Sequence, residues 1–180
     1  MSNVHFIGCL HLGHEKIAKY RGFYDAASMG DKLYENWNKK VNKKDLVYIL
    51  GDITMEKPDY YPQLDFLNGR KIVVMGNHDL PRDTKSLLEY VESVAGFVEW
   101  KGYALTHAPI HPDELGRYKA NIHAHIHHEN KLEIYNPRVM YKDSEERQST
   151  EGRYICCDAH LLNYTPLSYL QLKDERWANN

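Results

Sequence analysis

Short apolar runs alternate along the first half of the chain with segments whose apolar residues recur at helical spacing. Each run has the length of a β-strand, and the continuous apolar character of residues 46–50 is typical of a strand covered on both faces. Leu33, Trp37 and Val41 recur at every fourth position, which predicts a helix, and Asp31 can cap its start. The alternation of strands and helices favours a layered α/β domain.

The second half of the chain has a different pattern, in which strands follow one another closely. Residues 97–100 and 103–106 flank Lys101-Gly102, a pair that predicts a tight hairpin. Before the hairpin, a helix is expected from Asp83 to Gly96, because its apolar residues form one stripe. The remaining expected elements are a helix at 60–67, strands at 121–128, 131–135 and 153–157, and a polar surface excursion at 136–152.

Polar residues of the types that bind metals follow several of the apolar runs. The run at 71–75 ends in Gly76 and is followed at once by Asn77, His78 and Asp79. Polar groups are costly to place beside a core, so this stretch is either a capped turn or a reactive site. The same arrangement recurs at 4–11, 46–52, 103–107 and 121–128, and this repetition favours chemistry over a turn.

Length, charge and histidine content narrow the function classes. The chain has 180 residues, which suits a single domain over 1–180 with a core that needs no covalent staples. Eleven histidines are present, four of them within residues 123–128, and this bias indicates metal binding. The net charge of -2 and the lack of a long basic run argue against a grip on extended nucleic acid. These features do not exclude a compact phosphorylated substrate, and the sequence does not indicate the oligomeric state.

Cysteine usage and hydropathy favour a soluble cytoplasmic protein without a membrane partner. Three cysteines cannot all pair with one another, and Cys156 and Cys157 are adjacent, so a disulfide framework is not expected. Both are interpreted as small buried hydrophobes. His5, His11 and His14 interrupt the amino-terminal apolar stretch, and no run reaches the roughly 18 apolar residues of a membrane span.

The polar motifs together resemble those of a known enzyme family. Their order and spacing are similar to those of the calcineurin-like metallophosphoesterases, whose pattern is D-x-H, G-D, G-N-H-D, a lone H and G-H-x-H. The matching residues are Cys9-Leu10-His11, Gly51-Asp52, Gly76-Asn77-His78-Asp79, Thr106-His107 and His125-Ile126-His127. Segments 35–38, 45–52 and 163–166 resemble the small phage and bacterial branch, so the likeness spans nearly the whole chain. It implies a four-layer α/β/β/α sandwich of two mixed sheets flanked by helices.

The resemblance also implies a pair of divalent metal ions with a ligand set for each. One ion would be held by Cys9, His11, Asp52 and His127, and the other by Asp52, Asn77, His107 and His125. A hydroxide between the ions would attack phosphorus in line. His78, oriented by Asp79, would stabilise the transferring group and protonate the leaving oxygen.

Residue spacing and residue type agree with these ligand sets. In an extended segment, residues two apart share a face, so Cys9 with His11, and His125 with His127, can straddle a metal pair. Asn77 can hold a metal through its oxygen while its NH group meets a phosphate oxygen of the substrate. The assignment therefore makes chemical sense at each position.

Other polar residues near the motifs are assigned secondary roles. His14 and Arg21 can contact the substrate phosphate, although an ordinary surface salt bridge is the alternative for Arg21. For His123, a hydrogen-bonded role beside the ligands is expected rather than contact with a metal.

Two positions depart from the family pattern. Ala124 replaces the glycine of the last motif, which asks only for a backbone conformation open to a residue with Cβ. Cys9 replaces the first aspartate, and a thiolate favours zinc, iron or cobalt over magnesium or calcium. The alternative is that Cys9 stays protonated and one metal site is weak. The expected cofactors are two divalent ions, chosen from manganese, iron, zinc, nickel and cobalt.

The resemblance implies hydrolysis of a phosphomonoester or phosphodiester, with small nucleotides, cyclic ones included, as the substrate class to test first. The alternative is a catalytically weakened protein of the same fold that serves as a protein-interaction module, as a retromer subunit of similar outline does. His78 discriminates between the two, because a pure scaffold does not need the Asn-His-Asp set. A nuclease acting on long nucleic acid is disfavoured by the charge balance.

Overall fold

The computed structural model describes residues 2–127 and 153–173. Its strands are β1 (Val4–Ile7), β2 (Leu46–Ile49), β3 (Arg70–Val74), β4 (Ser93–Ala95), β5 (Val98–Trp100), β6 (Tyr103–Leu105), β7 (Ala120–His123), β8 (Tyr154–Cys156) and β9 (Leu167–Ser168). Its α-helices are α1 (Glu15–Tyr20), α2 (Ala26–Lys40), α3 (Thr84–Leu87), α4 (Pro112–Leu115) and α6 (Tyr169–Lys173), and 3-10 turns cover Pro58–Phe66 and Pro81–Asp83.

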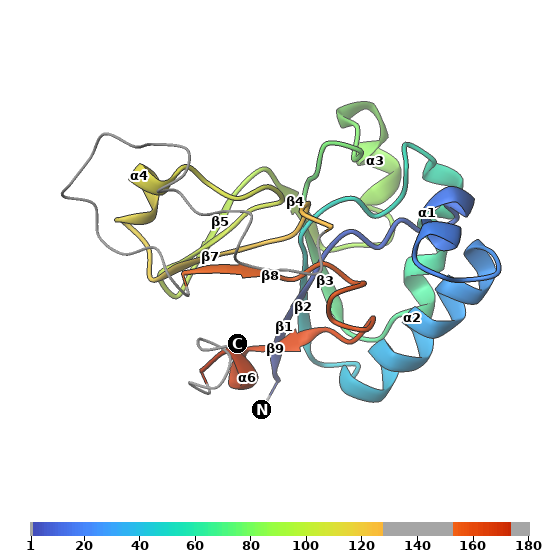
Figure 1. Ribbon diagram of the computed structural model, residues 1–180, viewed down its shortest axis with the longest axis horizontal. Coiled ribbons are helices and arrows are strands. Elements are labelled where there is room, and N and C mark those ends of the chain that lie inside the picture. Colours follow the sequence, from blue (N-terminus) through green and yellow to red (C-terminus); the bar gives the residue numbers. More distant parts are fainter. Residues whose placement is uncertain (1, 128–152, 174–180) are drawn as a thin grey trace.

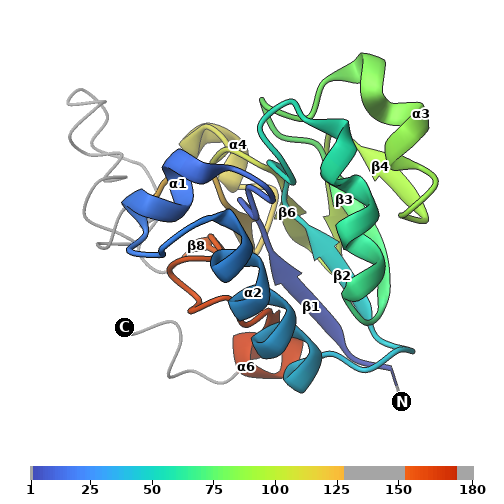
Figure 2. The same ribbon diagram turned by 90° about the vertical axis from the view of Figure 1, so that its right-hand side faces the viewer.

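The first sheet carries its strands in the order β4-β3-β2-β1-β9. Strands β1 to β4 run parallel, and β9 pairs antiparallel with β1, so the sheet is mixed. Helices α1, α2 and α3 cover one face and the second sheet lies toward the other (Figure 1). Figure 2 looks onto this helix layer, with α2 in front of the sheet. Because both faces are covered, Phe6, Ile49 and Val73 are fully buried, as their continuous apolar runs predict.

The second sheet carries its strands in the order β5-β6-β7-β8. Strands β6, β7 and β8 run parallel, whereas β5 pairs antiparallel with β6 in the predicted hairpin, with Trp100 opposite Tyr103. Lys101 and Gly102 have φ values of 51° and 82°, and two central residues with positive φ are what a type I′ turn requires. Two mixed sheets flanked by helices confirm the fold class that the resemblance implies.

The helices differ from the expectation at three places. Helix α2 begins earlier, because Asp25 rather than Asp31 is its cap: Asp25 Oδ1 accepts a hydrogen bond from Ser28 N at 2.7 Å. Residues 58–66 form a 3-10 turn instead of an α-helix, since Pro62 lies inside the segment. The helix expected over 83–96 is the single turn α3, because residues 93–95 instead pair with β3 as strand β4.

The strand expected at 131–135 and the excursion at 136–152 lie outside the described residues. The strand expected at 121–128 ends at His123, so the last two predicted ligands follow it rather than belong to it. Cys156 and Cys157 are buried, as predicted. None of the helices in the described part of the chain has the length and apolar character needed to cross a bilayer.

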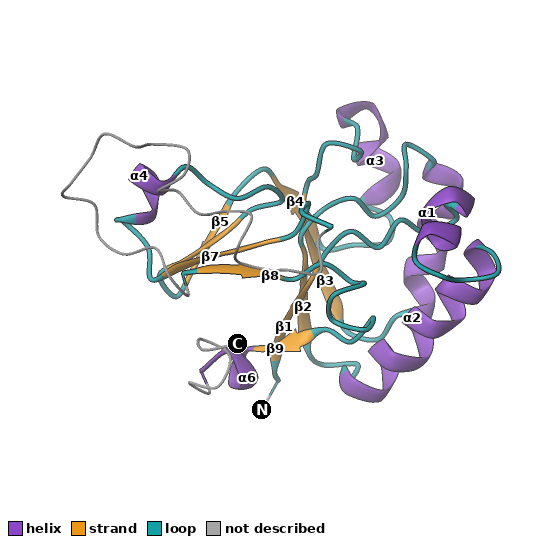
Figure 3. Ribbon diagram, viewed as in Figure 1, coloured by secondary structure: helices purple, strands orange, loops and turns teal. Residues whose placement is uncertain are grey.

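Strands β1, β2 and β3 of one sheet and β6, β7 and β8 of the other end in the same region. In Figure 3 the teal loops that follow the first group lie where β7 and β8 end. Backbone hydrogen bonds join the two groups: Gly8 N donates to Cys157 O at 2.8 Å, and Ala159 N donates to Gly8 O at 2.9 Å. The polar residues that follow these strands are therefore brought together at one edge of the sandwich.

Candidate metal centre

The loops after these strands gather the sequence-predicted metal ligands into one cluster. Ligand atoms of Cys9, His11 and His127 lie within 4.8 Å of one another, and so do those of Cys9, Asp52 and His107. Asn77 and His125 join the second group through contacts with His107. Cys9 thus lies between two groups of donor atoms.

The His107 imidazole lies at the centre of the second group. Its Nδ1 is 2.7 Å from the Leu50 carbonyl oxygen, so Nδ1 carries the hydrogen and Nε2 faces the cluster. Nε2 is 3.0 Å from Asn77 Oδ1, 3.0 Å from His125 Nδ1 and 3.4 Å from Asp52 Oδ2. Lone pairs this close repel one another unless a proton or a cation lies among them.

The pKa shifts of His107 and His125 also reflect how closely the donor atoms of this group are packed. Burial opposes a charge on His107, but the hydrogen bonds to Asp52 and to the Leu50 carbonyl outweigh it and raise the pKa of His107. Burial, followed by the positive charge of His107, lowers the pKa of His125. A cation among these atoms would neutralise the same crowded lone pairs.

His11 belongs to the first group and is almost fully buried. Neither ring nitrogen of His11 has a hydrogen-bond partner within the described ranges, which is a costly arrangement for a buried polar group. Burial, and then the charge of Arg21, lower the pKa of His11 to about 3, so its imidazole is neutral with a free lone pair. Such an orphaned imidazole, with the His127 ring centroid 5.2 Å away, fits a metal ligand.

Cys9 is buried at the junction of the two groups. Burial, and then the negative charges of Asp158 and Asp52, raise the pKa of the Cys9 thiol well above its usual value. The His125 backbone N–H donates to Cys9 Sγ at 3.2 Å, a contact that stabilises a thiolate once a cation has displaced the proton.

Several predicted ligands adopt a strained backbone conformation, which corrects the expectation that Cys9, His11 and His125 lie on extended segments. Cys9, His11, Asp52 and His125 have φ values of 54°, 50°, 54° and 69°, in the left-handed region that non-glycine residues rarely occupy. Each such residue costs about 1–3 kcal/mol and persists only where its surroundings enforce it. The left-handed turns, rather than a shared strand face, therefore aim these side chains into the cluster.

The spacing and the chemistry of the donor atoms in the cluster suit divalent cations. Metal–ligand bonds of about 2.0–2.3 Å place neighbouring donor atoms on one ion roughly 3–3.5 Å apart, and the 3.0–3.4 Å separations around His107 Nε2 match that spacing. Cys9, His11 and His127 offer sulfur and nitrogen, while Asp52, Asn77, His107 and His125 offer oxygen and nitrogen. Imidazole and thiolate donors suit zinc, iron, cobalt or nickel better than magnesium or calcium.

A family model described as calcineurin-like phosphoesterase matches residues 2–174. This chain belongs to the calcineurin-like phosphoesterase family. The family as a whole binds divalent metals, and this member is, at the general level, a metal-dependent phosphoesterase that hydrolyses phosphoric ester bonds. The family resemblance seen in the motifs is thereby confirmed.

Several relatives of this calcineurin-like phosphoesterase have known sequences or structures. The uncharacterised protein MJ1445 of Methanocaldococcus jannaschii is 31% identical over 175 residues, which cover 93% of this chain and 88% of the relative. The Gene 66 protein of Mycobacterium phage D29 is 43% identical over 89 residues, 45% of this chain and 42% of its own. The crystal structure of AQ665 from Aquifex aeolicus, a protein of unknown function, superposes with a TM-score of 0.65 and 25% identity, covering 96% of this chain and 98% of that one.

The expected orientation of His78 by Asp79 is wrong in this phosphoesterase. The buried Asp79 carboxylate accepts hydrogen bonds from the backbone N–H groups of Asp52, Ile53 and Gly76, at 2.7, 3.1 and 2.8 Å. It thus fixes the loops that carry the ligands. The His78 imidazole instead faces Glu56, with Nδ1 3.4 Å from Oε1, and its side chain stays 28% exposed beside the cluster.

Arg21 also differs from its predicted role in substrate binding. Its guanidinium is buried, pairs with Asp158 at 3.3 Å and donates to the Cys9 carbonyl at 3.1 Å, so it supports the ligand loop from behind. His14 caps α1, where its Nδ1 accepts from Ile17 N at 2.9 Å, and its ring centroid lies 6.4 Å from that of His11. Contact of His14 with a substrate stays a prediction.

Three more residues complete the surroundings of the ligands. His123 has the expected hydrogen-bonded role, donating from Nδ1 to the Ala124 carbonyl at 2.8 Å. The sequence reasoning missed Glu56, which carries no motif signal. It also missed Asp158, whose Oδ2 lies 2.7 Å from His127 Nδ1. A signal for Asp158 existed, because it follows the apolar run 154–157 just as Asp52 follows its own run.

Proposed function

We propose that this protein hydrolyses a small phosphorylated substrate, a phosphomonoester or a phosphodiester, at a dinuclear metal centre. Cys9, His11, Asp52 and His127 would hold one divalent ion, and Asp52, Asn77, His107 and His125 the other. The observation that supports the proposal is the crowding of nitrogen and oxygen atoms around His107 Nε2, together with the buried His11 ring, whose nitrogens have no hydrogen-bond partner in the described part of the chain.

The residues around the cluster have distinct tasks in this reaction. When bound, a pair of divalent ions lowers the pKa of water to give a nucleophile near neutral pH and neutralises charge on the phosphoryl oxygens. Asn77 would hold the substrate with its amide NH, because its Oδ1 faces His107 Nε2. His78 would act as the general acid in its doubly protonated form: its Nδ1–H faces the Glu56 carboxylate, and its Nε2 proton would pass to the leaving oxygen.

The proposed substrate class is a small nucleotide, cyclic ones included. The net charge of -2 offers little attraction for a long phosphate backbone, whereas a compact phosphate needs only the local cations. The cytoplasmic location and the lack of a membrane partner are part of the same proposal.

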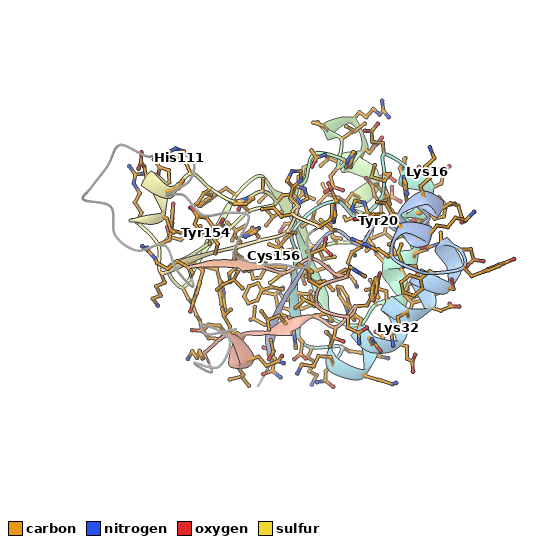
Figure 4. The ribbon with its side chains drawn as sticks, in the orientation of Figure 1. Lys16, Tyr20, Lys32, His111, Tyr154 and Cys156 are labelled. Atoms are coloured by element: carbon orange, nitrogen blue, oxygen red, sulfur yellow. The ribbon has the colours of Figure 1, made fainter. Side chains whose placement is uncertain are left out.

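The test is hydrolysis of aryl phosphomonoesters and phosphodiesters with manganese, iron, nickel, cobalt or zinc added singly. We expect His78→Ala to keep two metal equivalents per chain, because His78 is not in either ligand set, while turnover falls about 10²- to 10⁴-fold. His111→Ala is the matched control, since His111 lies beside α4 at the far end of the second sheet (Figure 4). Full turnover in His78→Ala, with metal bound, would show that His78 is not the general acid, whereas a wild-type chain that binds metal but hydrolyses no ester would favour the alternative role as a protein-interaction module.

Replacing Cys9 by aspartate tests whether the Cys9 thiolate is a metal ligand. We expect Cys9→Asp to shift the preference of the activating metal from zinc or cobalt toward manganese and magnesium, because a carboxylate is a harder ligand. Metal occupancy and turnover are measured for each ion in turn, with Cys156→Ala as the control for a buried cysteine outside both ligand groups. If Cys9→Ala leaves both occupancy and rate unchanged, Cys9 is not a ligand.

A further inference from the structure

Asp158 is buried directly behind the first group of ligands. Its side chain is 0% exposed, and its Oδ1 accepts a hydrogen bond from the His160 backbone N–H at 2.8 Å. The backbone around it is fixed as well, through the bridge between Gly8 and Asp158 and the hydrogen bond from Gly8 N to Cys157 O. Asp158 is therefore held rigidly next to the segment that carries Cys9 and His11.

The contact between Asp158 and His127 decides which nitrogen of His127 is free. Asp158 Oδ2 lies 2.7 Å from His127 Nδ1, so Nδ1 must carry a hydrogen and donate it to the carboxylate. The lone pair of the neutral ring is then on Nε2. Arg21 lies 3.4 Å from the same Nδ1 and cannot donate to it, because that nitrogen already bears a hydrogen.

Arg21 extends this arrangement to Cys9. One guanidinium nitrogen lies 3.3 Å from Asp158 Oδ2, and the other donates to the Cys9 carbonyl at 3.1 Å. Both charged side chains are buried, and a buried ion pair loses hydration that it only partly regains by attraction. A gain in stability therefore does not explain this buried pair. Its contacts instead reach Cys9 and His127, two predicted ligands of the same group.

We propose that Asp158 is a positioning residue for the Cys9–His11–His127 group: it fixes His127 with Nε2 toward the metal, and through Arg21 it holds the Cys9 carbonyl. This inference rests on the proposed function, because it needs a cation at that group. Carboxylates that orient metal-bound histidines commonly change metal affinity by about 10- to 100-fold when removed.

The first test is cobalt binding by Asp158→Asn, measured by equilibrium dialysis without substrate. The substitution removes the charge at nearly constant volume. We expect one of the two affinities to fall about 10- to 100-fold, with loss of the thiolate-to-cobalt absorption that marks the Cys9 position, and the other affinity to change less than about twofold. Unchanged affinities would overturn the inference.

Asp45→Asn is the matched control. Asp45 is also buried and lies 3.3 Å from the Nε2 of a buried histidine, His5, but at the opposite ends of β1 and β2. It measures the cost of losing a buried carboxylate–imidazole contact in this fold, and we expect both cobalt affinities to stay unchanged. Equal losses in the two variants would show a merely structural role for Asp158 and overturn the inference.

A second measurement needs no variant and holds even if Asp158→Asn does not fold. Nitrogen-15 NMR of the metal-free wild-type chain is expected to show His127 protonated on Nδ1, and a hydrogen on Nε2 of the neutral ring would contradict the inference. A wild-type chain that binds cobalt in this way but hydrolyses no phosphate ester would contradict the proposed function and leave the role of Asp158 intact.

Discussion

Asp52→Asn is expected to lose metal at both positions and to abolish hydrolysis. Asp52 is the carboxylate assigned to both ligand sets, and the substitution removes its charge while keeping its shape. Loss of a residue that merely orients a ligand costs about 10- to 100-fold in metal affinity, so loss of a shared ligand is expected to exceed roughly 100-fold. Metal titration and turnover with an aryl phosphate measure the effect.

Asp65→Asn serves as the control, because Asp65 is exposed in the 3-10 turn. Its metal content and rate are expected to equal those of the wild type. If Asp52→Asn still bound two equivalents with unchanged affinity, the carboxylate would not be shared between the ions, and the proposed ligand sets would be wrong.

Gly51→Ala is expected to destabilise the fold and the cluster together. A Cβ at Gly51 would lie 2.4 Å from Gly76 N and 2.6 Å from Gly76 Cα, backbone atoms that cannot move aside without shifting the loop of Asn77. Overpacking typically costs about 1–3 kcal/mol, and the left-handed backbone of Gly51 adds about 1–2 kcal/mol. The free energy of unfolding, from denaturant titration, should fall by about the sum, with metal affinity falling as well.

Gly22→Ala separates the cost of overpacking from the cost of the left-handed backbone. Gly22 has the same left-handed backbone, with φ of 83°, but a Cβ there would meet nothing within 4 Å. The free energy of unfolding of Gly22→Ala should fall only by the cost of the left-handed backbone, and its metal affinity should not change. A loss in Gly51→Ala no larger than in Gly22→Ala would mean that the loops of Asp52 and Asn77 do not pack as closely as described.

The sequence was sufficient to predict which strand ends bring the clustered side chains together, because that inference needs only apolar runs and the residues after them. Cys9, Asp52 and Asn77 each follow such a run, and parallel pairing of β1, β2 and β3 brings their ends together. The hairpin at Lys101 and Gly102 was equally predictable, since its turn depends on two adjacent residues.

The contacts that hold the ligands could not be predicted in the same way, because they depend on residues far apart in the chain. Arg21 and Asp158 meet only when β8 pairs beside β7, and neither residue belongs to a motif. Asp79 was assigned to its neighbour His78, whereas its carboxylate contacts backbone groups 26 and 27 residues away. His125 lies at the centre of a tight turn with φ of 69°, in which Ile126 N donates to Ala124 O at 2.8 Å, and spacing alone does not reveal such a turn.

Anomalous diffraction from crystals grown with cobalt is the most direct test of the metal pair. Two peaks are expected about 3.5–4 Å apart. One should lie within bonding distance of Cys9, His11 and His127, the other of Asn77, His107 and His125, with Asp52 contacting both. A single peak, or peaks away from these side chains, would contradict the account.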